Sequence, residues 1–189
     1  MDMAKKKKGL VIIIMAGLII FAGVFAVSNT GGTGQTSQQH DIMNLFLKAY
    51  YNVDDHESYD MVMENIENKN TSAFEYYEKM YNDILTEDAY VQLIASRAIV
   101  KPEQIVKDFD CKLELLNTKF ERGGDTLEGY PTYSYKADVK ITLSNQKSEN
   151  FEATGYINFT QEGDKWKIDY LKFDYGALSR RANELFSGS

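Results

Sequence analysis

The stretch DKWKIDYLKFDY, residues 164–175, changes its hydrophobic phase halfway along. Up to Tyr170 apolar side chains occupy alternate positions, as expected of a strand with one buried face. From Leu171 onward the alternation continues one residue out of step, which would send the side chains to the opposite face. A β-bulge near Tyr170 and Leu171 would supply the extra residue, bend the strand and restore a common buried face. The apolar residues are Trp166, Ile168 and Tyr170 before the change and Leu171, Phe173 and Tyr175 after it.

Three segments that precede this stretch also read as strands. Residues 110–120, 133–144 and 150–161 are rich in alternating apolar residues. The turn-forming sequences SNQKSEN and QEGDK follow the second and third segments, and RGGD, Arg122–Asp125, reads as the turn after the first. Consecutive strands joined by short turns predict an antiparallel meander with one buried face.

Four segments between residues 40 and 99 have apolar residues at helical spacing. They are residues 40–53, 57–66, 70–85 and 85–99. In the first, Ile42, Leu45, Phe46 and Ala49 form the predicted apolar face, and Thr86 is placed to cap the fourth. Helices followed by a meander predict an α+β domain, in which N-terminal helices pack on a curved antiparallel sheet of about four strands.

The N-terminus has the pattern of a membrane anchor. Lys5, Lys6, Lys7 and Lys8 precede a mostly apolar run at residues 9–27, long enough for about 28 Å of helix. The excess of lysine before the run predicts a cytoplasmic N-terminus and an extracytoplasmic remainder. We therefore expect a basic tail at residues 1–8, a transmembrane helix at 9–27, a flexible Gly/Ser/Thr/Gln linker at 28–40 and an outer domain at 41–189.

A cleaved signal peptide is the alternative interpretation of this segment. Val24 and Ala26, or Ala26 and Ser28, are small residues spaced as at a cleavage site. The length of the apolar run favours retention in a single-pass membrane protein.

The outer domain is acidic. Without Asp2 and the four lysines of the tail, 27 acidic and 17 basic residues remain, a formal charge of about −10. Such a surface repels phosphate and argues against nucleic-acid binding by this domain. The lysine cluster beside the apolar run is expected to contact anionic membrane lipid instead.

Residues suited to catalysis or metal binding are few. The histidines are His40, at the end of the predicted linker, and His56, in the acidic sequence at 54–57. Four consecutive ligand-type residues cannot all converge on one ion, so we interpret this sequence as a polar turn in which an Asp caps the next helix, with a weak cation site as the alternative. Cys111 shares a face with Leu113 and reads as a core residue. We expect no enzyme activity, no catalytic residue, no metal and no cofactor.

The C-terminal segment at 176–186 has an amphipathic helical pattern. Two interpretations remain open, because the helix could pack on its own sheet or could dock on a partner. The residues of this possible interaction helix are Leu178, Arg180, Arg181, Leu185 and Phe186.

The order of helices, four strands, a kinked last strand and the Trp-containing DKWKI resembles the nuclear transport factor 2-like superfamily. The resemblance spans residues 41–175 and implies a cone-like α+β fold. Enzymes of that superfamily use an acid–base pair such as Asp with Tyr inside the cone. Asp138 and Asp169 lie opposite the apolar rows and are predicted to be exposed, so the sequence offers no such pair.

The layout of basic tail, single span, tether and outer α+β domain resembles the bitopic scaffold proteins of type IV secretion and conjugation systems, especially those of Gram-positive bacteria. The sequence FLKAYYNVDDHESYDMV, residues 46–62, resembles the start of such domains. This resemblance implies a non-catalytic assembly role, with self-association and contacts to other subunits of a membrane secretion complex. The alternatives are a cell-surface module that holds a small apolar ligand or wall fragment in its cone, and a membrane-anchored regulatory or immunity protein.

Overall fold

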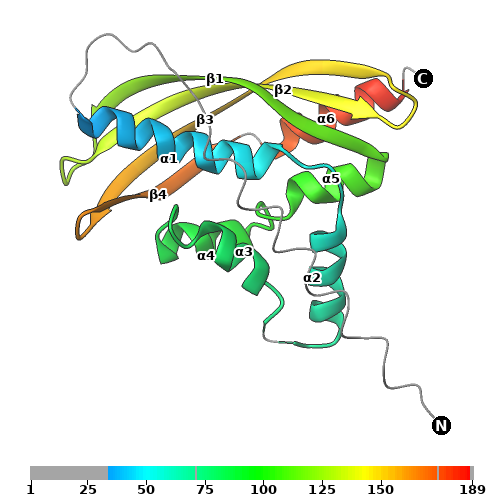
Figure 1. The fold of residues 1–189 in the computed structure, drawn as a ribbon, viewed down its shortest axis with the longest axis horizontal. Helices are drawn as coiled ribbons and strands as arrows, with labels where there is room; N and C mark the ends of the chain where they lie inside the picture. The colour runs from blue at the N-terminus through cyan, green and yellow to red at the C-terminus, as the bar shows by residue number, and fades with distance from the viewer. Residues whose placement is uncertain (1–33, 71, 174, 188–189) are drawn as a thin grey trace. The chain divides into compact units, whose positions relative to one another are not determined.

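A four-stranded antiparallel meander, in the order β1-β2-β3-β4, forms the centre of the computed structural model (Figure 1). The structure describes residues 34–70, 72–173 and 175–187. The strands are β1 (Cys111–Asp125), β2 (Pro131–Leu143), β3 (Ser148–Glu162) and β4 (Lys165–Phe173). In the described residues the helices are α1 (Gly34–Tyr51), α2 (Glu57–Glu67), α3 (Glu75–Tyr81), α4 (Glu87–Ala95), α5 (Lys101–Phe109) and α6 (Tyr175–Ser187). The predicted α+β class and four-stranded meander are confirmed.

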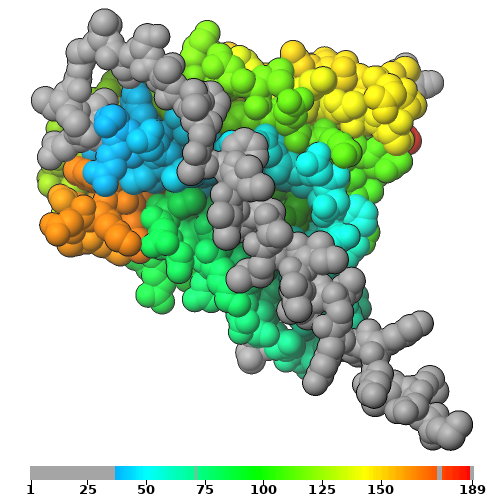
Figure 2. Space-filling view, in the orientation of Figure 1, coloured from blue at the N-terminus to red at the C-terminus, as the bar shows by residue number. Residues whose placement is uncertain are grey.

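The sheet curls around α1. This helix contacts both β1 and β4, although these two strands are the opposite edges of the sheet. Figure 2 shows the blue atoms of α1 between green atoms above them and orange atoms below. Met43, Phe46 and Leu47 of α1 are completely buried against the inward face, so α1 fills the space that the curled sheet encloses.

A bulge in β4 explains the phase change in the sequence. Ile168 pairs with Phe159 and Tyr170 pairs with Asn158, so Asp169 is an extra residue without a counterpart in β3. Ile168 before the bulge and Leu171 after it are both buried, whereas Tyr170 points outward and is exposed. The predicted bulge is present, one residue earlier than the sequence suggested.

The bulge is held by the segment that leads into α4. The N–H of Ile168 donates to Ile84 O and the N–H of Thr86 donates to Ile168 O, each over 2.9 Å. The Thr86 hydroxyl accepts the N–H of Ala89, as an N-cap, and donates to Asp169 Oδ1 over 3.1 Å. One threonine therefore links the first turn of α4 to the extra residue of β4, and the predicted cap at Thr86 is confirmed.

The first helix begins earlier than predicted and buries a different set of side chains. It starts at Gly34, so residues 34–40, which the composition assigned to a linker, are helical. Gln39 is buried and accepts a 2.7 Å hydrogen bond from Tyr133 Oη. The placement of Leu45 on the buried face is wrong, because its side chain is 56% exposed. The buried face consists instead of residues spaced three to four apart, such as Met43 and Leu47.

Two further assignments differ from the sequence analysis. The sequence RGGD is not a turn, because β1 continues through it and Asp125 pairs with Pro131. The turn lies at residues 126–130, where Gly129 adopts a φ of 82° that favours glycine. Helix α5 was not predicted. Pro102 lies in its first turn, a position where the missing N–H of proline is not needed.

No helix in residues 34–70, 72–173 and 175–187 is long and apolar enough to cross a membrane. The predicted span at residues 9–27, with the lysines before it, lies outside the described residues, and its assignment stays a prediction.

Gly155 marks the closest approach within the sheet. A Cβ at this position would lie 2.5 Å from Tyr135 Cε1 and 2.6 Å from the backbone oxygen of Lys172. We expect Gly155→Ala to lower the free energy of unfolding by about 1–3 kcal/mol, because neither neighbour can move without disturbing the sheet. Urea unfolding measures the change. The control is Gly124→Ala, whose Cβ meets nothing within 4 Å. Equal stability of the two variants would contradict the observed packing.

The link between Thr86 and Asp169 is testable with a nearly isosteric pair. Thr86→Val removes the hydroxyl and is expected to lower the free energy of unfolding by about 1–2 kcal/mol, since it loses both the helix cap and the bond to the bulge. Thr86→Ser keeps the hydroxyl and should retain most of the wild-type stability. If valine and serine behave alike in thermal and urea unfolding, the hydroxyl does not stabilise this junction.

Candidate functional site

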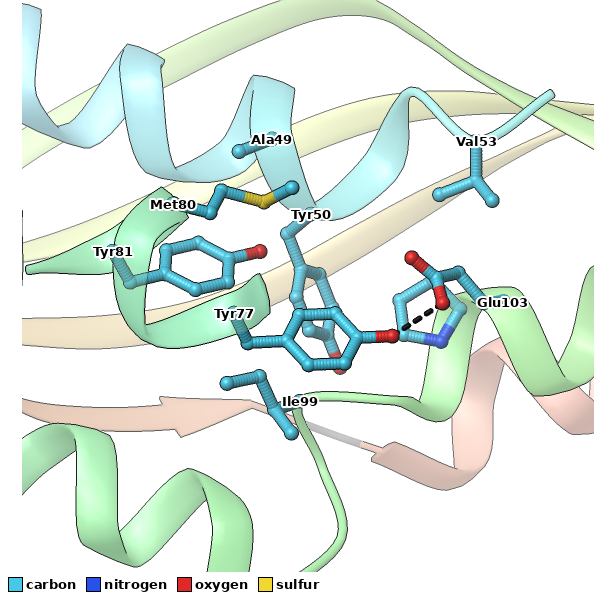
Figure 3. Close-up of a pocket in the computed structure, with 9 residues that line it drawn as sticks. Ala49, Tyr50, Val53, Tyr77, Met80, Tyr81, Ile99 and Glu103 are labelled. Atoms are coloured by element: carbon cyan, nitrogen blue, oxygen red, sulfur yellow. Dashed lines mark hydrogen bonds between the residues drawn. The ribbon is translucent and has the colours of Figure 1, made fainter. Parts of the chain in front are cut away.

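A small cavity lies between α1, α3 and α5 (Figure 3). Its volume of about 10 Å³ gives room for roughly one water molecule. Tyr50 comes from α1, Tyr77 and Tyr81 from α3, and Glu103 from α5. The cavity combines aromatic walls with one carboxylate, which is the composition that an acid–base site would need.

Tyr77 and Glu103 form the polar centre of this cavity. The Tyr77 hydroxyl donates a short hydrogen bond to Glu103 Oε2, and Figure 3 shows the two side chains directed at each other. Glu103 also accepts a backbone hydrogen bond from Tyr59, in the first turn of α2. The carboxylate therefore connects three helices. It also accepts a hydrogen bond from one of the N–H groups that have no partner within the first turn of a helix.

Burial changes the proton affinity of both groups. Desolvation is the main cause that raises the pKa of Glu103 above its ordinary value, while the hydrogen bond from Tyr77 opposes it. Desolvation and the nearby Glu103 charge raise the pKa of Tyr77. Tyr77 therefore remains protonated and donates its hydrogen, which makes the pair a structural link between α3 and α5.

The histidines do not contribute to this centre. His40 is not at the end of a linker but within α1, where its ring lies 5.2 Å from the Phe120 ring and 5.5 Å from the Tyr133 ring. Burial lowers the pKa of His40. His56 lies at the start of α2, and its Nδ1 is 2.7 Å from Asp60 Oδ2.

The acidic sequence at 54–57 is a turn whose charges are engaged nearby. Asp55 Oδ1 accepts the N–H of Glu57 over 3.0 Å within this turn. The predicted Asp cap is wrong, because the N-cap residue of α2 is His56, whose side chain makes no capping hydrogen bond. Lys112 Nζ lies 3.5 Å from Asp54 Oδ1. Among the described residues, no group of three or more His, Cys, Asp or Glu side chains is arranged to hold a metal ion.

Cys111 is buried at the start of β1, as the sequence suggested. Burial raises the pKa of its thiol to about 11. The thiol is therefore protonated at neutral pH and is a poor nucleophile.

The C-terminal helix packs on its own domain. α6 contacts α5 and β3, with Leu178 buried and the Phe186 ring 6.1 Å from the Phe109 ring. Leu185 is half-buried, whereas Arg180 and Arg181 are exposed and Phe186 remains 58% exposed. Packing on the sheet uses only part of this helix, so its outer residues remain accessible in the described structure.

Sequence reasoning missed Glu103 because it missed α5. It sought a buried Asp on the strands, where Asp138 is half-buried and Asp169 is exposed. The available signal was Pro102 followed by Ile105, Val106 and Phe109 at helical spacing, which would have placed Glu103 in a first turn.

Comparisons with known proteins are sparse. No family model and no curated protein matches the chain. Among solved structures, the chain is similar to a periplasmic fragment of TraM, with a TM-score of 0.41 and 9% identity over 73% of this chain and 96% of that chain. It is also similar to the intermembrane space region of the chloroplast protein ARC6, with a TM-score of 0.36 and 11% identity over 64% of this chain and 96% of that chain. Both TM-scores lie below 0.5, so neither likeness bears on function, and the nuclear transport factor 2-like resemblance stays a prediction.

Loss of the Tyr77 hydroxyl should destabilise the protein in a pH-dependent way. The raised pKa means that the folded state prefers protonated Glu103. The stability that protonated Glu103 contributes is complete below the pH range in which an ordinary Glu titrates, and it is lost as the pH rises through the raised pKa. We expect Tyr77→Phe to cost about 1–3 kcal/mol at pH 7 and less at pH 4, because a charged Glu103 depends more on its donor. Urea unfolding at both pH values measures this.

Two variants control that experiment. Tyr76→Phe changes the adjacent, 38% exposed tyrosine and should have little effect at either pH. Glu103→Gln removes the titrating group. The cost of adding Tyr77→Phe to the Glu103→Gln variant should therefore be the same at both pH values. An equal cost of Tyr77→Phe at pH 4 and pH 7 would refute the coupling.

Proposed function

We propose that this protein is a non-catalytic, membrane-anchored scaffold of a conjugative type IV secretion machine, with its α+β domain outside the cytoplasm. The observation that carries the proposal is the filled interior of the curled sheet. Tyr133, Val139 and Ile157 on the inward face are at most 1% exposed, and α1 occupies the space between the two edges of the sheet. Binding that depends on such a domain has to use its outer surfaces.

The layout of the sequence supports the membrane anchor. Four lysines followed by an apolar run of membrane-spanning length predict a single-pass protein with a cytoplasmic N-terminus. The resemblance of this layout to bitopic secretion scaffolds supplies the assembly role. We further propose that the partners are membrane lipid at the anchor, a second copy of the chain, and other subunits of the machine, and that the acidic outer domain binds no nucleic acid.

The outward face of the sheet supports a role in protein contacts. It carries pairs of opposite charges, such as Lys136 with Glu152 at 3.1 Å and Lys140 with Glu114 at 3.9 Å. Tyr156 and Tyr170 are 36% and 38% exposed on the same face. Tyrosine is enriched in the surfaces through which proteins bind one another, and polar residues form the rim of such surfaces.

The ligand-binding alternative is less well supported. Pockets for small molecules have volumes of about 300–1,000 Å³ and are mostly apolar. The cavity beside Tyr77 measures about 10 Å³, and a groove of about 270 Å³ between β3 and α6 is lined largely by the charged side chains of Glu152, Arg180, Arg181 and Glu184. A ligand in the cone would have to displace α1, whose Phe46 is completely buried.

Site-specific photo-crosslinking in the native host tests the scaffold proposal. A photo-reactive amino acid replaces Tyr156, Tyr170 or Phe186, one position at a time, in the tagged full-length chain, and the captured proteins are identified by mass spectrometry. We expect channel subunits and membrane ATPases of a transfer system from at least one position. Replacement of Tyr76, which has similar exposure but lies at the start of α3, serves as the comparison position. Capture of only wall proteins, or of a single toxin-like protein, would refute the proposal.

A further inference from the structure

The free edge of β1 consists of a covered half and an open half. In the covered half, Val53 and Leu113 exchange two backbone hydrogen bonds of 3.0 and 2.9 Å. The N–H of Leu115 donates to Asn52 Oδ1 over 2.7 Å. After the bulge between Leu115 and Asn117, no described residue pairs with the backbone of residues 117–122 on this side.

The register shows which backbone groups face the open edge. Leu113 bonds to Val53, so its N–H and C=O point away from β2, and in an antiparallel pair this direction alternates along the strand. The bulge shifts the alternation by one residue. Asn117, Lys119 and Glu121 therefore face β2. Consistent with this, the Ser134 hydroxyl of β2 donates to Glu121 O over 3.5 Å. The residues that direct their backbone groups to the open edge are Thr118, Phe120 and Arg122.

The charges on this half are not balanced within the chain. Lys119 lies directly opposite Lys136 of β2, and like charges at opposed positions destabilise a sheet. Lys136 is paired with Glu152. Among the described residues, neither Lys119 nor Glu121 forms an ion pair, although both are exposed on the outward face.

We infer that the open half of the β1 edge pairs with the same segment of a second copy of this chain, antiparallel and centred on Phe120. In this register Lys119 lies opposite the partner's Glu121, and the two-fold axis repeats the pair. Thr118 lies opposite the partner's Arg122, and Phe120 opposite the partner's Phe120. The backbone groups of all three residues then find partners, and two four-stranded sheets join into one.

Other registers do not place opposite charges together while also pairing the backbone groups of residues 118–122. A two-fold axis at Lys119 would place Lys119 opposite the partner's Lys119, and an axis at Glu121 would oppose two glutamates. Axes at Thr118 or Arg122 would move one end of the pairing toward the covered half or the irregular pairing beyond Arg122. Only the axis at Phe120 keeps the whole pairing within residues 118–122 and satisfies both charges.

A short pairing of this kind buries little surface and is weak between freely diffusing chains. Two chains anchored in one membrane have a higher effective concentration, which favours the contact. This last point rests on the proposed membrane anchor, whereas the register and the charge match do not depend on it.

Disulfide crosslinking of the full-length protein in membranes tests the register. Two differently tagged chains are co-expressed, one with Lys119→Cys and the other with Glu121→Cys. Opposed residues in an antiparallel pair have Cα atoms about 4.5–5.5 Å apart, within the range that a disulfide bridges. Lys112→Cys with Glu114→Cys is the matched control, because these residues repeat the Lys-x-Glu pattern in the covered half of the same strand. We expect a mixed disulfide from the first pair and none above background from the second.

Exchanging the two charges tests whether Lys119 and Glu121 face each other across the interface. The quantity measured is the amount of one tagged copy that is recovered with the other. Lys119→Glu and Glu121→Lys should each reduce the association about tenfold, since each places like charges opposite one another twice. The double variant K119E/E121K restores opposite charges and should restore the recovery. Lys172→Glu, at an exposed position of β4, makes the same charge change away from the edge and should leave it unchanged.

The inference is overturned if the 119–121 disulfide does not exceed the 112–114 control, or if the double variant recovers no better than the single ones. Either result leaves the scaffold proposal intact when photo-crosslinks from Tyr156, Tyr170 or Phe186 still capture secretion subunits. Loss of those crosslinks with an intact 119–121 disulfide would refute the scaffold proposal alone.

Discussion

The curvature of the sheet follows from the bulge at Asp169 in β4. A strand with the phase of residues 164–175 can bury both its halves on one face only if one residue is left out of the pairing, and Asp169 is that residue. The bend that results brings β4 toward α1. Because the Thr86 hydroxyl bonds to both Asp169 and the first turn of α4, the same feature also positions the start of α4.

Closing the sheet around α1 determines what kind of site the domain can offer. The space inside the curled sheet is occupied by Met43, Phe46 and Leu47 of α1. The carboxylate–tyrosine pair at Glu103 and Tyr77 lies outside the sheet, among the helices, beside a cavity of about 10 Å³. Its hydrogen bond links α3 to α5.

Two surfaces of the domain, the outward face of the sheet and the edge of β1, differ in how their charged and hydrogen-bonding groups are paired. On the outward face of the sheet, Lys136 and Lys140 form ion pairs with acidic residues of neighbouring strands. Residues 52 and 53 bond to the edge of β1 up to the bulge at Leu116, and beyond it no residue of the described part of the chain does so. A bulge usually protects an edge by disturbing its pairing. In this strand it also shifts the phase, so that Lys119 and Glu121 lie on the outward face beside the open half of the edge.

Periodicity and turn chemistry are local properties, so the α+β class, the meander, the cap at Thr86 and the need for a bulge in the last strand could all be predicted from the sequence. It did not reveal that residues 34–40 are helical, since their polar composition is stabilised by contacts such as that of Gln39 with Tyr133, far away in the chain. Nor did it reveal that Leu45 is exposed, because the face that α1 buries is chosen by the curvature of the sheet. The sequence did not predict the pairing of Tyr77 with Glu103 or the covered half of β1. Each joins segments that lie far apart in the chain, and their proximity depends on how the helices pack.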